Sequence, residues 1–121
     1  MAEEVKVSTR SRPRAADQSV VELVELDLQR LLEALVDPVR RSIVHQLAVR
    51  GEDISCGDFV LSVARSTATH HFKVLRRAGL ISQYYRGTSH LNTLRRADLD
   101  REFPGLLDAL LKAVPRDSPV R

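Results

Sequence analysis

Residues 65–80 have the sequence RSTATHHFKVLRRAGL, and this stretch decides the fold. Ser66 and Thr67 are candidate helix caps at its start and Gly79 is a candidate stop, which predicts a helix of about three and a half turns. One face is built to pack and the other is polar without a carboxylate. The packing face holds Ala68, His71, Phe72 and Leu75, and the polar face holds Ser66, Thr69, His70, Lys73 and Arg77.

The polar face of this predicted helix suits the major groove of DNA. Short donors and acceptors near a helix N-terminus reach base edges, and flanking Lys and Arg neutralise phosphates. Acidic residues are absent from Phe59 through Ala97, whereas seven cations occur there: Arg65, Lys73, Arg76, Arg77, Arg86, Arg95 and Arg96. The pattern predicts a polyanion, double-stranded DNA, as the partner.

The chain of 121 residues is long enough for one domain, predicted at 19–114 between a disordered arm at 1–18 and a flexible tail at 115–121. Aromatic residues make up 4%, so the core must be aliphatic. The single cysteine, Cys56, excludes an internal disulfide and fits a reducing compartment. No segment resembles a signal peptide or a membrane span, so we expect a cytoplasmic protein with no membrane partner.

Residues 19–36 form the first predicted helix, with Ser19 as N-cap and Glu22 completing a capping box. Leucine and valine surround its whole circumference, which favours burial against a second copy and hence a homodimer. The alternative is a central helix wrapped by its own chain. A last helix, predicted at 97–114 and interrupted or restarted at Pro104-Gly105, adds a second apolar stripe. The predicted dimer residues are Val24, Leu28, Leu31, Leu107, Leu110 and Leu111.

Between these helices, Asp37-Pro38 is typical of a helix start, as N-cap and first helical residue, and Gly51 of its end. The predicted helix therefore runs from Pro38 to about Val49. A short further helix is predicted from near Ser55 to about Leu61, with uncertain ends because Gly57 is a poor helix residue.

Two short alternating runs, 80–85 and 89–94, follow the helix predicted at 65–80 and predict a β-hairpin with Gly87 at its tip. Such a hairpin is a wing, and Arg86 at the tip would contact the minor groove or the DNA backbone. The predicted fold is mainly α with a small β-hairpin: a winged helix-turn-helix with a dimerisation helix at each end.

Two motifs resemble those of the ArsR/SmtB family of bacterial repressors. Residues 35–44, LVDPVRRSIV, are similar to the family's "ALxDPxRxxIL" opening, and residues 66–81, STATHHFKVLRRAGLI, to its "STVSHHLKVLREAGLV" motif. The wing sequence Arg86-Gly87-Thr88 fits the family's "xxGRxxxY" hairpin loosely. The resemblance covers roughly residues 32–94.

The resemblance implies a homodimer that binds an imperfect palindrome in a promoter and usually represses transcription. It implies that His71 faces inward and is structural. It also implies DNA contacts at Arg65, Ser66, Thr67, Thr69, His70 and Lys73, with Arg86 on the wing.

The chain departs from the metal-sensing members of that family, which carry a Cys-x-Cys pair or Asp and His ligands on the last helix. One thiol cannot complete a tetrahedral site, and no histidine follows Ala97, so we predict no metal and no cofactor. Three roles stay open for Cys56: a small half-buried residue, a redox or thiol-reactive sensor, or a metal ligand. A small-molecule or redox inducer is compatible with the sequence, which identifies neither.

The sequence offers no nucleophile paired with a base, no phosphate-binding glycine loop and no carboxylate cluster, so we do not expect an enzyme. The main alternative to DNA binding is a winged-helix module whose basic face docks an acidic protein partner.

Overall fold

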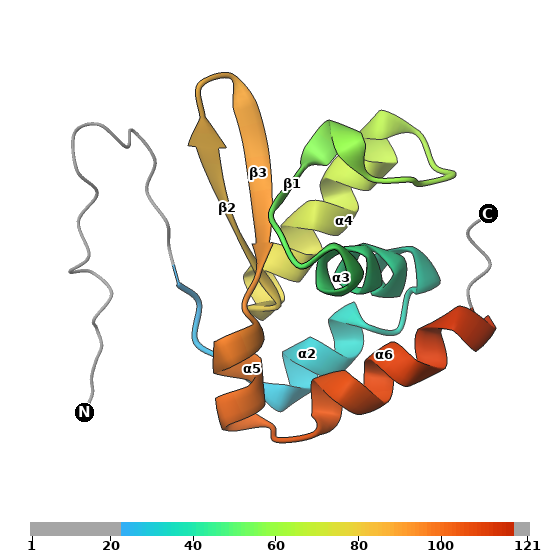
Figure 1. Ribbon diagram of the computed structural model, residues 1–121, viewed down its shortest axis with the longest axis vertical. Coiled ribbons are helices and arrows are strands. Elements are labelled where there is room, and N and C mark those ends of the chain that lie inside the picture. Colours follow the sequence, from blue (N-terminus) through green and yellow to red (C-terminus); the bar gives the residue numbers. More distant parts are fainter. Residues whose placement is uncertain (1–22, 118–121) are drawn as a thin grey trace.

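The computed structural model describes residues 23–117, and Figure 1 shows their arrangement. The elements in chain order are α2 (Leu28–Ala34), α3 (Pro38–Arg50), β1 (Ile54–Ser55), a 3₁₀ turn (Cys56–Asp58), α4 (Arg65–Ala78), β2 (Ile81–Arg86), β3 (Ser89–Leu94), α5 (Arg96–Glu102) and α6 (Leu106–Asp117). Helix α3 contacts α4 and α6, α2 contacts α4 directly, and in Figure 1 the hairpin projects away from α2, α5 and α6. The predicted arm at 1–18 lies outside the described residues.

Helix α3 begins and ends where its sequence predicts. The Asp37 carboxylate accepts hydrogen bonds from the backbone N–H groups of Val39 at 2.7 Å and Arg40 at 3.4 Å, and Pro38 occupies the first helical position. At the other end Gly51 adopts a left-handed conformation, with φ of 66°, and its N–H bonds to the carbonyl of Leu47.

Helix α4 ends at Gly79 as predicted but starts before the predicted caps. Its N-cap is Ala64, which is extended and has no side-chain oxygen, so Ser66 and Thr67 lie inside the first turn and the cap prediction is wrong. Gly79 has φ of 86°, and its N–H donates to the carbonyls of Arg76 and Leu75.

The hydrophobic core is aliphatic, as the composition predicts. The packing face of α4 meets the buried face of α3 there, and Leu31, Leu99 and Leu107 close it from the other helices. The buried side chains of α3 and α4 in this core are Ile43, Val44, Leu47, Phe72, Leu75 and Ala78. The two-sided pattern read from the sequence of α4 is therefore its actual orientation.

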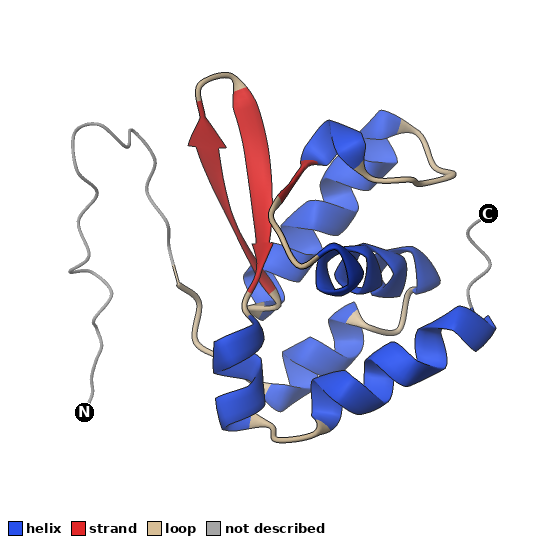
Figure 2. Cartoon of the chain, in the orientation of Figure 1, coloured by secondary structure: helices blue, strands red, loops and turns tan. Residues whose placement is uncertain are grey.

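The β-hairpin of the wing is confirmed, and a third strand joins it (Figure 2). Strands β2 and β3 pair antiparallel, and Gly87 at the tip has φ of 64°. Strand β1 pairs with β3 on its other side, with Ile54 opposite Asn92. The predicted helix from Ser55 to Leu61 is wrong, because β1 takes Ser55 and only three residues after it form a 3₁₀ turn.

The first predicted helix is shorter than its sequence suggests. Ser19 and Glu22 lie outside the described residues, and residues 23–27 are not helical. Asp27 is extended and its carboxylate accepts from the backbone N–H of Arg30 at 3.1 Å, so Asp27 caps α2. The preceding segment is held by Arg95, which donates to the carbonyl of Val24 at 2.7 Å.

The C-terminal helical region breaks at Pro104-Gly105, as predicted, into α5 and α6. Gly105 has φ of 87°, a conformation that ends one helix and redirects the chain. Helix α6 continues through Asp117, so the tail predicted from residue 115 begins too early.

Candidate nucleic-acid interface

The polar face of α4 is exposed to solvent along its whole length. Every residue predicted to contact DNA is exposed: Arg65, Ser66, Thr67, Thr69, His70, Lys73, Arg77 and, at the end of β2, Arg86. The first seven lie on one helix, and Arg86 lies beside the hairpin tip. The structure therefore gathers the predicted residues on α4 and leaves Arg86 on a separate projection.

Thr69 presents a defined chemical group on this face. Its hydroxyl donates to the carbonyl of Arg65 at 3.0 Å, within the helix. The proton is thereby engaged, and the hydroxyl oxygen of this exposed residue keeps lone pairs that can accept. Such a threonine accepts from an adenine or cytosine amino group, or packs on a thymine methyl group.

The N-terminus of α4 adds a positive end to the same face. Because Ala64 provides no side-chain cap, the first backbone N–H groups have no side-chain acceptor. Uncapped N–H groups and the helix dipole together favour an anion, and Arg65 stands in this first turn. A DNA phosphate would satisfy both.

His71 faces inward, as its place on the predicted packing face and the family resemblance both imply. It is 6% exposed, and its Nδ1 lies 3.1 Å from Nη1 of Arg40. A guanidinium can only donate, so Nδ1 accepts and the ring is neutral with its proton on Nε2. Arg40 also donates from Nε to the carbonyl of Ala34 at 2.6 Å, which ties α2 to α4 through α3.

Acid should destabilise this junction. Burial lowers the pKa of His71 below its ordinary value of 6.5, the charges of Arg40 and His70 lower it further, and Asp37 opposes them. The unfolded chain therefore binds the proton more readily than the folded one. The contribution of His71 to the free energy of unfolding is complete above pH 6.5 and is lost as the pH falls below it.

We expect the wild-type protein to lose more unfolding free energy between pH 7.5 and pH 5 than the His71→Asn variant. Asparagine keeps an acceptor for Arg40 but does not titrate. Urea unfolding at both pH values measures the two losses. Part of the pH dependence persists in the variant because burial and Arg76 also lower the pKa of His90. Identical acid losses in the two proteins would contradict this role of His71.

Two cations of the acid-free stretch are neutralised by acids that come later in the chain. Arg95 is almost buried and pairs with Asp98 at 3.0 Å, and Arg96 pairs with Asp100 at 3.5 Å and Asp108 at 2.5 Å. Burial alone would raise the pKa of Asp98, but hydrogen bonds from Arg101 and Arg95 outweigh it and lower the value. These arginines support the fold rather than a polyanion site.

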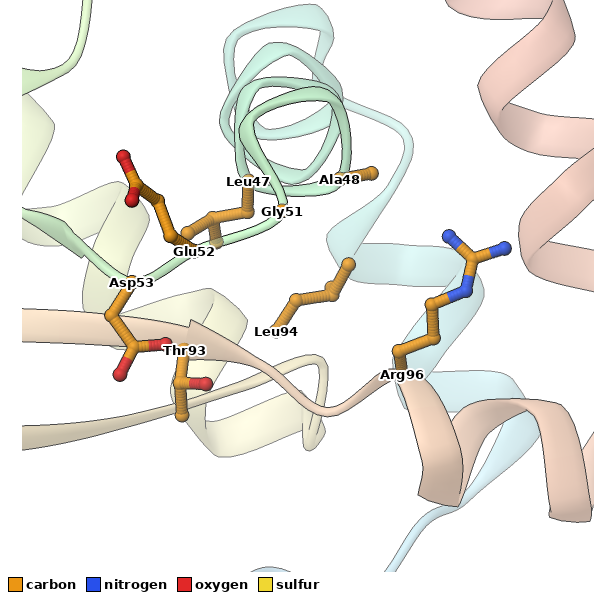
Figure 3. Close-up of a pocket in the computed structure, with 8 residues that line it drawn as sticks. All are labelled: Leu47, Ala48, Gly51, Glu52, Asp53, Thr93, Leu94 and Arg96. Carbon is orange, nitrogen blue, oxygen red and sulfur yellow. The ribbon is translucent and has the colours of Figure 1, made fainter.

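A cavity of about 190 Å³ beside Arg96 has a mixed lining (Figure 3). Figure 3 shows Leu47 and Leu94 in its interior, the carboxylates of Glu52 and Asp53 on one side and the Arg96 guanidinium on the other. Because its lining carries both positive and negative charges, this cavity differs electrostatically from the polar face of α4, which carries no carboxylate.

Arg76 connects the predicted recognition helix to the wing. Its Nε donates to Oε1 of Gln83 at 3.1 Å, and Gln83 donates to Oδ1 of Asn92 at 2.8 Å. Asn92 is fully buried and donates to the carbonyl of Ile54. The sequence did not predict this series of hydrogen bonds. Its one signal was the hairpin register, which places Gln83 opposite Asn92.

Cys56 is half-buried within the same region. Its Sγ accepts from Nδ2 of Asn92 at 3.3 Å and Nε2 of Gln83 at 3.8 Å, and it lies 3.9 Å from Nδ1 of His90. The ring of His90 stacks on Tyr85, with centroids 4.2 Å apart. Within residues 23–117 no three His, Cys, Asp or Glu side chains are grouped to hold a metal ion.

Two comparisons with known proteins bear on the family. Residues 35–84 match a family described as "Helix-turn-helix domain", a range that includes α3 and α4. The Bacillus subtilis (strain 168) protein named "Uncharacterized HTH-type transcriptional regulator YceK" is 33% identical over 82 residues, which cover 66% of this chain and 82% of that protein. The chain belongs to the helix-turn-helix family of transcriptional regulators. Its fold is a winged helix-turn-helix, with the β2–β3 hairpin as the wing.

The matched range stops within β2, so this likeness covers α4 but only half of the wing. None of the described helices is both long and apolar enough to span a membrane.

Proposed function

We propose that this helix-turn-helix regulator is a sequence-specific DNA-binding repressor that acts as a homodimer on a palindromic operator. The observation that carries the proposal is the exposed face of α4, which offers hydroxyls, an imidazole and cations without a carboxylate. A helix with such a face is suited to the major groove.

The residues of that face divide into two roles. Thr69 and His70 carry groups that distinguish one base edge from another, so they would read sequence. Lys73, Arg77 and Arg65 would neutralise phosphates, and Arg86 would contact the DNA backbone or minor groove beside the wing. Their contribution to affinity is electrostatic and falls steeply as salt rises.

The support for a dimer is an apolar strip on α2. Leu28 and Leu32 lie one turn apart and are 47% and 46% exposed, and exposed apolar residues so grouped are typical of interfaces. Val24, Leu110 and Leu111 are half-buried, and Leu110 and Leu111 pack against the protomer's own core. The two other predicted dimer residues do not face outward: Leu31 is 1% exposed and Leu107 is 3% exposed, since both fill the protomer's own core.

The double substitution Leu28→Glu/Leu32→Glu should convert the dimer into a folded monomer, because four carboxylates would meet across the two-fold axis. Sedimentation velocity measures the change. Val60→Glu is the matched control: Val60 is 76% exposed and distant from α2 in sequence, so this variant should stay dimeric. A wild-type protein that sediments as a monomer would contradict the dimer.

The function is tested by titrating the full chain into fluorescent DNA from upstream of its own coding sequence and into a scrambled duplex. We expect tighter binding to the first, with affinity for both falling as salt rises. Equal affinity for the two duplexes would contradict an operator in this region. No binding to either would instead favour a module that docks an acidic protein.

A further inference from the structure

A second feature lies beside the recognition helix, in an open cleft between α2 and the last two turns of α4. Its volume is about 680 Å³, and small-molecule sites in proteins span roughly 300–1,000 Å³. The lining residues are Val24, Arg30, Glu33, Ala34, Val74, Arg76, Arg77 and Ala78.

The floor of this cleft is apolar and made of small side chains. Ala34 and Ala78 are 1% and 4% exposed, and Val24 and Val74 are half-buried beside them. Ala34 and Ala78 lie beneath the surface of the cleft, so its accessible apolar contacts come from Val24 and Val74. The floor therefore suits the apolar body of a ligand.

The rim is strongly cationic. Arg30 and Arg77 are exposed, and within residues 23–117 neither side chain makes an ion pair. Among the described residues, Arg76 hydrogen-bonds through its Nε to Gln83. The single carboxylate of the lining, Glu33, accepts from Nε2 of Gln29 at 2.8 Å. Three guanidinium groups face one carboxylate, so the cleft complements an anion.

We propose that this cleft binds a small organic anion, a carboxylate on an apolar body, with Arg30 and Arg77 holding the carboxylate. Guanidinium groups bind carboxylates through paired, charge-assisted hydrogen bonds. The effect on DNA rests on the function proposed above: Arg77 belongs to both the cleft and the face of α4. A bound anion would withdraw it from DNA phosphate, and DNA would weaken anion binding by the same factor.

Benzoate is a suitable probe, with benzyl alcohol as its uncharged analogue and sulfate as a bare anion. Titrated into the ¹⁵N-labelled full chain, benzoate should give saturable NMR shifts at Val24, Ala34 and Val74, with a dissociation constant on the order of 1 mM for so small a ligand. Benzyl alcohol should give no saturable shifts there, and sulfate should displace benzoate only weakly.

Arg30→Ala should weaken benzoate binding about tenfold, the loss expected for one charge-assisted contact, and Arg30→Lys less. Arg50→Ala is the matched control because Arg50 is an exposed arginine on α3 outside the cleft. Benzoate should weaken DNA binding by wild type and Arg50→Ala several-fold at saturation, and Arg30→Ala should need about tenfold more benzoate for the same effect.

The binding experiment contains no DNA, so the cleft and the DNA-binding function can fail separately. Non-saturable shifts, equal binding of benzyl alcohol, equal displacement by sulfate, or full benzoate binding by Arg30→Ala would each overturn the proposal. Benzoate binding that leaves DNA affinity unchanged would overturn the coupling through Arg77.

Discussion

Replacing Thr69 and His70 together with alanine should weaken binding to the upstream DNA by about 10- to 100-fold and change binding to scrambled DNA by less than about threefold. Both side chains are exposed in the N-terminal half of α4, the part of a recognition helix that meets base edges. Neither packs in the core, so the thermal stability of the variant should stay close to that of the wild type. Fluorescence anisotropy on the two duplexes measures the ratio.

Arg77→Ala provides the contrasting case. It removes a phosphate contact, so affinity should fall for both duplexes alike, and the slope of log affinity against log salt should decrease by about one. The division of roles on α4 would be wrong if the Thr69/His70 double variant lost affinity equally on both duplexes.

The largest expected loss of stability comes from Gly79→Ala. At φ of 86° a side chain is strained, and the added Cβ would lie 2.5 Å from Cδ2 of Leu26 and 3.1 Å from Nη1 of Arg95. Strain and overpacking together should lower the free energy of unfolding by about 2–5 kcal/mol. Urea unfolding measures the loss.

Gly51→Ala separates the two causes. Gly51 has a similar φ of 66°, but its Cβ would meet nothing within 4 Å, so only backbone strain remains and the loss should be about 1–2 kcal/mol. The difference between the variants measures how closely the segment before α2 packs on the end of α4. Equal losses at the two glycines would contradict that packing.

What the sequence predicts well depends on local signals. Asp37-Pro38 and Gly51 bound α3 because capping and left-handed turns involve adjacent residues. The two faces of α4 follow from helical periodicity, and the hairpin follows from alternation around Gly87. The exposure of the candidate DNA-binding residues is predictable for the same reason, because helical spacing decides which residues share the outer face.

What the sequence does not predict depends on contacts between distant residues. Strand β1 exists because β3 lies beside it, with buried Asn92 donating to the carbonyl of Ile54 from 38 positions away. Arg96 belongs to a stretch without acids, yet the fold brings the Asp108 carboxylate of α6 to it, whereas the pairs Arg95–Asp98 and Arg96–Asp100 are local and follow from helical spacing. A count of charges along the chain cannot reveal such pairing.

The apolar helices show the same limit. Helical spacing identifies which leucines share a face but not whether that face meets the protomer's own core or a partner. Leu31 and Leu107 meet the core, whereas Leu28 and Leu32 stay exposed. Nor does the sequence place Arg30 near Arg77, which only the packing of α2 against α4 brings to one cleft.

Guanine methylation by dimethyl sulfate tests the central claim most directly, because it reports on guanine N7 in the major groove, where α4 is proposed to bind. In the presence of the protein, guanines in the upstream DNA should be protected in two tracts about one helical turn apart, and protection should be lost with the Thr69/His70 double variant. Full binding with every guanine N7 still reactive would contradict the claim that α4 enters the major groove.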